Sequence, residues 1–122
     1  MVDLNITGTL LTLRFLPPYT DADERDYLDA LVVIGEHPTP FELLTLFGGS
    51  GKLSAAAERE QALWFKATRD KIAARCRAVA IVVPGASRKM EDTFRKLWPM
   101  PLVALEDENE ARAFLAQHAQ AA

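Results

Sequence analysis

Residues 41–60 read FELLTLFGGSGKLSAAAERE, and this stretch decides the fold. Residues 41–47 are almost continuously apolar, glycines cluster at residues 48–51, and a helical pattern then runs from Leu53 to about Cys76. A buried strand that leads through a glycine turn into a helix places free backbone N–H groups at the start of that helix. We therefore expect any binding site of this chain at the turn and at the beginning of the long helix.

Further apolar runs lie on the carboxyl side of this stretch. Residues 79–83 and 102–105 are unbroken and each lies next to a proline, which is typical of short strands buried on both faces of a parallel sheet. Residues 2–7 and 11–15 instead alternate between apolar and polar side chains, with Gly8 between them. This alternation predicts a tight hairpin of two strands at the edge of the sheet, with one face in water.

The segments between the strands have helical periodicity. Three of them begin with a residue that commonly caps a helix, namely Thr20, Ser87 and Asp107. The predicted order is therefore β-β-α-β-α-β-α-β-α, with four helices and a mixed five-stranded sheet in which an N-terminal edge hairpin joins central parallel strands. Because 122 residues is an ordinary length for one domain, we expect a single α/β domain over residues 1–122.

The composition limits the classes of function. A net charge of −3 argues against a general nucleic-acid binder, because such proteins usually carry a strongly basic face. The one cysteine cannot form an internal disulfide, which favours the reducing cytoplasm. The chain starts without a signal-peptide pattern, and no apolar run approaches the roughly 20 residues that a membrane span needs. We expect a cytoplasmic domain with no membrane span.

The long helix predicted over residues 53–76 carries two apolar strips. One strip consists of small or aliphatic residues: Leu53, Ala56, Leu63, Ala67 and Ala74. The other, about a third of a turn away, contains Phe65, Ile72 and Cys76. Because alanines allow close approach, we expect the first strip to lie against the sheet. The second strip must then pack on a neighbouring helix, on a protein partner or on a second copy of the chain. The candidate partner surface comprises Trp64, Phe65, Arg69 and Ile72.

The two long helices differ in charge. The helix that follows residue 20 begins with several acidic residues, whereas basic residues outnumber acidic ones in residues 52–77. The opposite charges of the two helices could favour their packing side by side. The basic charge of the second helix could instead steer an acidic partner towards it. The sequence leaves both alternatives open, together with a simply solvated helix face.

The glycine turn departs from the phosphate-binding loop of nucleotide hydrolases at two positions. That pattern needs a glycine five positions before Gly51 and a hydroxyl residue after Lys52, and this chain has Leu46 and Leu53 there. The sequence therefore argues against a nucleotide hydrolase. The turn and the helix start still suit a phosphate or carboxylate, and the candidate anion-binding residues are Gly49, Ser50, Gly51, Lys52 and Ser54. The alternative is a plain connection between strand and helix.

No pattern in the chain points to catalysis. Neither His37 nor His118 has a second histidine or a cysteine at metal-ligand spacing, and no nucleophile elbow, metalloprotease motif or paired-cysteine motif is present. Cys76 lies between two arginines, which would make an exposed thiol reactive, but a buried structural cysteine is the simpler interpretation. We expect no catalytic residues, no metal and no cofactor, and hence a protein that is not an enzyme.

The element order and local sequence resemble those of the bacterial STAS-like proteins, relatives of the anti-sigma-factor antagonists. The resemblance covers nearly the whole chain. It depends on residues 20–23, residues 41–44 before the glycine turn, Trp64 with Arg69, the strand at 78–84, and the closing helical segment EARAFL, residues 110–115. It implies a mixed sheet and a role in binding or regulation without catalysis.

The resemblance also implies a candidate phosphorylation residue. In the well-studied antagonists a partner kinase phosphorylates a serine at the junction between the third strand and the second helix, and this switches partner binding off. The matching junction here holds Ser50, although Gly48 and Gly49 replace the acidic residue that precedes the serine in those proteins. A phosphate there would be tolerated at a helix N-terminus and would alter a docking surface.

The leading functional hypothesis is a regulatory module that binds an unidentified protein partner, or a second copy of itself, through residues 48–54 and the helix over 53–76. The alternative hypothesis is a binding domain for a small anionic ligand, either a lipid or a nucleotide phosphate, at the glycine turn. A small enzyme with unrecognised residues is the third.

Overall fold

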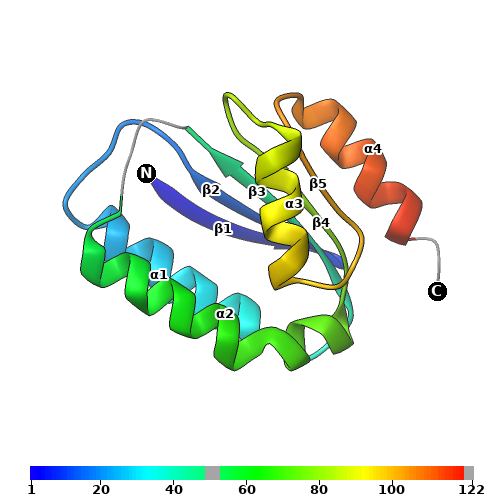
Figure 1. Cartoon of the computed structure of the whole chain (residues 1–122), viewed down its shortest axis with the longest axis horizontal. Coiled ribbons are helices and arrows are strands. Elements are labelled where there is room, and N and C mark those ends of the chain that lie inside the picture. The colour runs from blue at the N-terminus through cyan, green and yellow to red at the C-terminus, as the bar shows by residue number, and fades with distance from the viewer. Residues whose placement is uncertain (49–52, 120–122) are drawn as a thin grey trace.

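The computed structural model describes residues 1–48 and 53–119. Its elements follow the predicted order: β1 (Val2–Thr7), β2 (Leu10–Phe15), α1 (Asp23–Gly35), β3 (Phe41–Phe47), α2 (Ala55–Arg75), β4 (Cys76–Val82), α3 (Arg88–Leu97), β5 (Leu102–Leu105) and α4 (Glu108–Ala119). Figure 1 shows the strands arranged as one sheet with helices packed on it.

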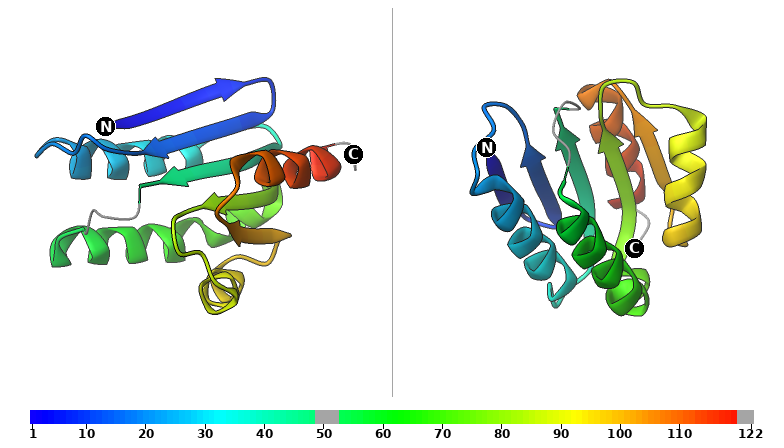
Figure 2. Two further views of the ribbon diagram at one scale, coloured as in Figure 1. Left: turned by 90° about the horizontal axis from the view of Figure 1, so that it is seen from above. Right: turned by 60° about the vertical axis from the view of Figure 1, so that its left-hand side comes forward.

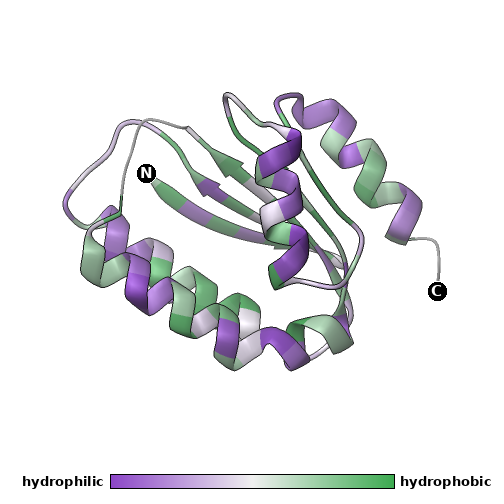
Figure 3. Cartoon of the chain, in the orientation of Figure 1, coloured by the Kyte–Doolittle hydropathy of each residue, from purple (hydrophilic) through white to green (hydrophobic). Residues whose placement is uncertain are grey.

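The sheet has the order β1-β2-β3-β4-β5. Strands β1 and β2 are antiparallel, and each later neighbour is parallel to the one before it. Gly8 makes the hairpin turn between β1 and β2 with a φ of 59°, which glycine adopts without strain. The predicted edge hairpin and the predicted parallel strands are therefore both confirmed. Figure 3 shows the alternation of hydropathy along β1 and the largely hydrophobic character of β4.

Helices cover both faces of the sheet (Figure 2). Residues of β3 alternate between the faces: Phe41 and Leu43 join the larger core under α1, α2 and α3, whereas Leu44 and Leu46 join a smaller core under α4. This arrangement explains why the apolar run of β3 is nearly continuous, since both faces of the strand are buried.

The start of α1 differs from the prediction. Thr20 is not the N-cap, because the helix begins at Asp23 and no side chain caps it. Instead, Asp23 itself is buried and accepts hydrogen bonds from the Thr20 N–H at 2.7 Å, the Thr20 hydroxyl at 3.2 Å and the amine of Met1 at 2.7 Å. The carboxylate therefore organises the turn before the helix, and the threonine is a donor to it.

Leu53 packs against the core as predicted, but beyond it the two strips of α2 are reversed relative to the prediction. Ile72 and Cys76 are buried in the core and Phe65 packs against it, whereas Leu63 is 67% exposed and Ala67 and Ala74 are exposed. The physical reason is area. Large side chains bury more apolar surface than alanines do, so the strip with the aromatic ring lies against the sheet and the small residues face outward.

The same helix is the longest in the structure, with 21 residues, and it carries charged residues along its whole length. Within residues 1–48 and 53–119, no helix is long and apolar enough to cross a membrane.

Candidate functional site

The predicted anion site falls mostly on residues that the structure does not describe. Gly49, Ser50, Gly51 and Lys52 lie outside the described residues, so their binding of an anion and the phosphorylation of Ser50 remain predictions. Ser54 is described, and it is the N-cap of α2: its Oγ accepts a hydrogen bond from the N–H of Ala57 at 3.2 Å.

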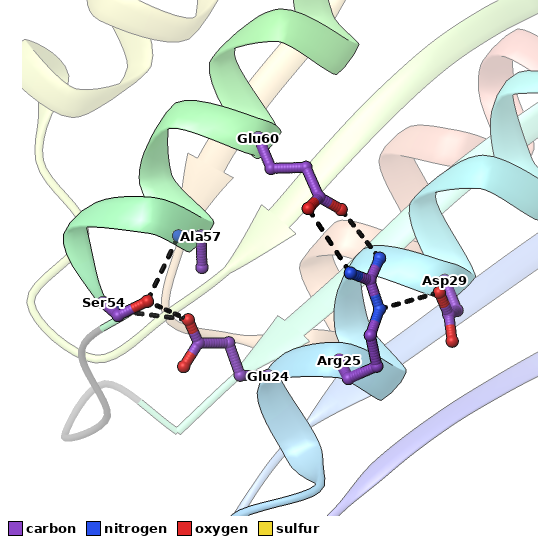
Figure 4. Close-up of polar contacts among 6 residues, drawn as sticks. All are labelled: Glu24, Arg25, Asp29, Ser54, Ala57 and Glu60. Atoms are coloured by element: carbon purple, nitrogen blue, oxygen red, sulfur yellow. Dashed lines mark hydrogen bonds and ion pairs between the residues drawn. The ribbon is translucent and has the colours of Figure 1, made fainter.

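The N-terminus of α2 already faces an anion from within the chain. The Ser54 hydroxyl and the Ser54 N–H both donate to the carboxylate of Glu24 on α1, as Figure 4 shows. A helix N-terminus favours negative charge, and here a carboxylate of the protein supplies it. Ser54 therefore ties α2 to α1, and in this arrangement its hydroxyl is engaged with Glu24.

Helices α1 and α2 lie side by side and run parallel (Figure 2, right). Glu24 meets Ser54 near their starts, the Arg25 guanidinium donates to Glu60 at 2.7 Å, and an arginine at the end of α2, Arg75, donates to the His37 carbonyl at 3.1 Å. The Arg25–Glu60 ion pair does not follow the predicted attraction between an acidic first helix and a basic second helix. Arg25 belongs to the acidic helix and Glu60 to the basic one (Figure 4).

The exposed side of this helix pair carries apolar side chains. Val32 is 45% exposed, Val33 is 48% exposed, and Leu63 is the most exposed of them. Arg25 and Glu60 contact each other and so lie at the same position along the two helix axes. Val32 and Ala67 each lie seven residues further along their helices, so they also lie beside each other. We call the surface formed by Val32, Val33, Leu63 and Ala67 the outer α1–α2 face.

The predicted partner residues are distributed differently. Ile72 is fully buried inside this chain, so its place on a partner surface is wrong, for the reason that reversed the strips. Trp64 and Phe65 are half-buried and pack against the core, with the Phe65 ring 5.0 Å from that of Trp98. Arg69 is exposed. Of the predicted set, Arg69 alone lies free on the surface.

Sequence reasoning missed the valines of this face. Tyr27, Leu28, Leu31 and Ile34 form the buried stripe of α1, and Val32 and Val33 fall outside it. Apolar β-branched residues outside the stripe of an amphipathic helix were the available signal.

A second feature, the inner cavity, lies beneath the same helices. It has a volume of about 320 Å³ and lies between the sheet and helices α1, α2 and α3. Its wall combines aliphatic side chains with aromatic ones, and the aromatic residues are Phe15, Tyr19, Tyr27, Phe47, Phe65, Phe94 and Trp98. Among residues 1–48 and 53–119, no charged side chain lines it.

Two of the residues that line the inner cavity, Tyr27 and Trp98, carry buried polar groups. The Tyr27 hydroxyl donates to Oε1 of Gln61 at 2.5 Å, and burial raises the pKa of Tyr27 well above its ordinary value. Trp98 is 4% exposed, and its indole N–H has no hydrogen-bond partner among the described residues. A buried donor of this kind is unusual, because nearly all buried polar groups in proteins are paired.

The other two side chains that could take part in chemistry, Cys76 and His37, pack inside the structure. Cys76 is buried, its thiol donates to the Ala78 carbonyl at 3.3 Å, and burial raises its pKa to about 12. The His37 ring stacks edge-on against Phe41. Within the part of the chain that the structure describes, no group of three or more His, Cys, Asp or Glu residues could hold a metal ion.

Comparison with known proteins places the architecture in a known class. The sheet order and the helices on both faces define a SpoIIAA-like α/β fold. A crystal structure of an uncharacterised protein of the DUF3478 family from Shewanella loihica PV-4, which has this fold, superimposes with a TM-score of 0.62 over 94% of this chain and 92% of that chain, at 17% identity. No protein-family model and no curated protein matches the sequence. The predicted resemblance to STAS-like proteins is confirmed for the fold.

Proposed function

We propose that this chain is a non-enzymatic regulatory module that works in the cytoplasm by binding a protein, either a partner or a second copy of itself. The contact is made through the outer α1–α2 face, formed by Val32, Val33, Leu63 and Ala67. This keeps the predicted helix as the contact element but replaces its inward strip with the outward one.

The observation that carries the proposal is the exposure of Leu63, which leaves two thirds of a leucine side chain in water on the middle of a long helix. Two half-exposed valines lie on the neighbouring helix. Single exposed apolar residues are common, but a group of them on adjacent helices is a feature of interaction surfaces. Arg59, Lys66 and Arg69 are exposed on the same helix, and an apolar centre with a charged rim is the usual anatomy of an interface.

The test compares Leu63→Asp with a matched variant at another exposed leucine. Leu97 is 38% exposed at the end of α3 and lies outside the outer α1–α2 face, so Leu97→Asp is the control. Both substitutions should leave the fold intact, because both side chains are solvent-exposed in the wild type.

Sedimentation velocity of the purified protein reports self-association, and an affinity pull-down with the tagged protein, followed by reconstitution with the purified partner, reports a second protein. We expect Leu63→Asp to abolish the dimer or the reconstituted complex and Leu97→Asp to preserve it. A monomeric wild type whose retained proteins are the same for both variants would contradict the proposal.

A further inference from the structure

We propose that β1 is a second interaction surface, on which another copy of this chain adds its own β1 to the edge of the sheet. The two strands run antiparallel, with Leu4 opposite Leu4 of the second copy, so that one sheet continues through both copies. This goes beyond the proposed function, because the pairing uses the edge of the sheet and leaves the outer α1–α2 face free for a partner.

The β5 edge of the sheet is covered by side chains of α3, which lies beside that strand (Figure 2, right). Arg95 donates to the Leu102 carbonyl at 3.1 Å, and the Ala104 N–H donates to the Glu91 carboxylate at 3.2 Å. These two backbone groups point away from β4 and have partners within the chain. An edge that is covered in this way is protected against pairing with another strand.

The β1 edge has no such cover among the described residues. The amine of Met1 donates to the Leu16 carbonyl at 2.8 Å and the Leu16 N–H donates back to the Met1 carbonyl at 2.9 Å, so these residues form a hydrogen-bonded pair of the β1–β2 ladder. Such pairs alternate along an antiparallel ladder. In this register the N–H and C=O groups of Val2, Leu4 and Ile6 therefore point away from β2.

Strand β1 also lacks the features with which proteins protect an exposed edge. Such edges commonly carry a lysine, a proline or a bulge that prevents pairing. Residues 2–7 contain no lysine and no proline, and β1 pairs with β2 without a register shift. A regular strand with outward-pointing backbone groups is therefore available to a further strand.

The sequence of β1 is complementary to itself. With Leu4 opposite Leu4 of the second copy, Val2 lies opposite Ile6 on the face that carries the apolar side chains. Ile6 is 48% exposed in the single chain, and this pairing covers it. The outward-pointing backbone groups of all three residues find partners in this register.

The charge of β1 selects this register among the antiparallel ones. Asp3 lies opposite Asn5 of the second copy, where the carboxamide can donate to the carboxylate. The neighbouring register on one side would place Asp3 against Asp3, and the one on the other side would leave Val2 beyond the end of the second strand. Because the pairing is two-fold symmetric, each of these contacts occurs twice.

A concentration series of the wild type is the first measurement. A single added strand makes a small interface, so we expect monomer and dimer to exchange, and sedimentation equilibrium gives the dissociation constant. The Leu4 and Ile6 amides should exchange with solvent more slowly as the dimer forms. The Asp3 and Asn5 amides bond to β2 and should be protected at every concentration, which makes them internal controls.

Two variants at exposed apolar residues test the edge itself. Ile6→Lys should raise the dissociation constant at least about tenfold, because a lysine on an edge strand opposes pairing. Leu97 is 38% exposed at the end of α3 and lies outside both proposed surfaces. The matched control Leu97→Lys should therefore stay within about twofold of the wild type.

An exchange of charge tests the register. Asn5→Asp places a carboxylate opposite Asp3 of the second copy twice in each dimer and should weaken the dimer about tenfold. The double variant Asp3→Asn with Asn5→Asp again sets a carboxylate against a carboxamide, so its dissociation constant should return to within about twofold of the wild type. Failure of this rescue would overturn the register.

The two proposed surfaces can fail separately. Leu63→Asp should keep this dimer and lose the partner, whereas Ile6→Lys should lose the dimer and keep the partner. A wild type that stays monomeric throughout the series, or a dimer that Ile6→Lys and Asn5→Asp leave unchanged, would overturn the β1 edge. A dimer that is lost in Leu63→Asp and kept in Ile6→Lys would also overturn it, and would place self-association on the outer α1–α2 face.

Discussion

Gly35 of α1 lies directly against Trp64 of α2: a methyl group added to Gly35 would lie 3.0 Å from the indole Nε1 and 3.0 Å from Cγ2 of Thr68. That separation is tighter than ordinary carbon contacts, so the absence of a side chain at Gly35 lets the two parallel helices approach. Both neighbours are side chains of the same helix, so relief requires the Trp64 ring and the Thr68 side chain to shift, or α2 to move away from α1 at this level.

Gly35→Val should therefore destabilise the protein by about 2 kcal/mol, a typical cost of overpacking. Urea unfolding followed by circular dichroism measures the change. Ala67→Val is the control, because Ala67 is exposed on the outer side of α2 and should change the free energy of unfolding by less than about 0.5 kcal/mol. Equal unfolding midpoints for the two variants would contradict the close approach.

The second prediction concerns a buried carboxylate of β3. Glu42 is 2% exposed, and its two oxygens accept from the Arg77 Nε at 2.7 Å and the Thr9 hydroxyl at 2.7 Å. Removing the arginine leaves a buried charge without its partner, which is more costly than losing the pair as a whole. Arg77→Met should lower the free energy of unfolding by about 3 kcal/mol.

The double variant Arg77→Met with Glu42→Leu separates the two effects. Because neither charge then remains, most of the lost stability should return, and the sum of the single-variant changes should exceed the change of the double variant. Strict additivity in urea unfolding would show that the two side chains do not interact.

The third prediction concerns the loss of folding stability at acid pH through Asp23. The hydrogen bond from the amine of Met1 and that from the Thr20 N–H lower the pKa of Asp23 below its ordinary value. A lowered pKa in the folded state stabilises the protein above the unfolded-state pKa of about 3.9, and this contribution is lost as the pH falls below that value.

Asp23→Asn should be less stable than the wild type at neutral pH, and the difference should shrink as the pH falls through about 4. Thermal unfolding at a series of pH values between neutrality and strong acid measures it. Asp26→Asn, a change at an exposed residue of the same helix turn, should leave the pH dependence of stability close to that of the wild type. A constant difference between Asp23→Asn and the wild type would refute the role of Asp23.

The order of strands and helices was predictable because hydrophobic period and burial agree along the strands. Residues 2–7 alternate since one face of the hairpin is wet, and residues 41–47 do not alternate since helices cover both faces. Ser87 caps α3 as predicted, with its Oγ accepting from Met90 N–H at 3.2 Å. In these segments the hydropathy pattern of the sequence matches the burial of each side chain in the folded chain.

The candidate site was harder to predict because it depends on which side of a helix faces the sheet. Both strips of α2 are apolar, so the helical period alone cannot choose between them, and the bulky strip prevails only because it fills the space beside Trp98. The inner cavity was not predictable for a related reason. Most of its lining residues come from three strands and three helices that meet only in the folded chain.

The last prediction concerns the thiol of Cys76, which the sequence places between two arginines. The arginines would favour a reactive thiolate at an exposed position, but burial prevails and raises the pKa of the thiol to about 12. Because thiolate is the reactive form, Ellman's reagent at pH 8 should react with the native protein only as fast as the chain opens, and at once in urea, where the pKa returns to about 8.5. Destabilising Gly35→Val should accelerate the native reaction, whereas Leu63→Asp should not. Rapid, stoichiometric reaction of the folded wild type would mean that Cys76 is accessible and that the end of α2 does not pack as the structure has it.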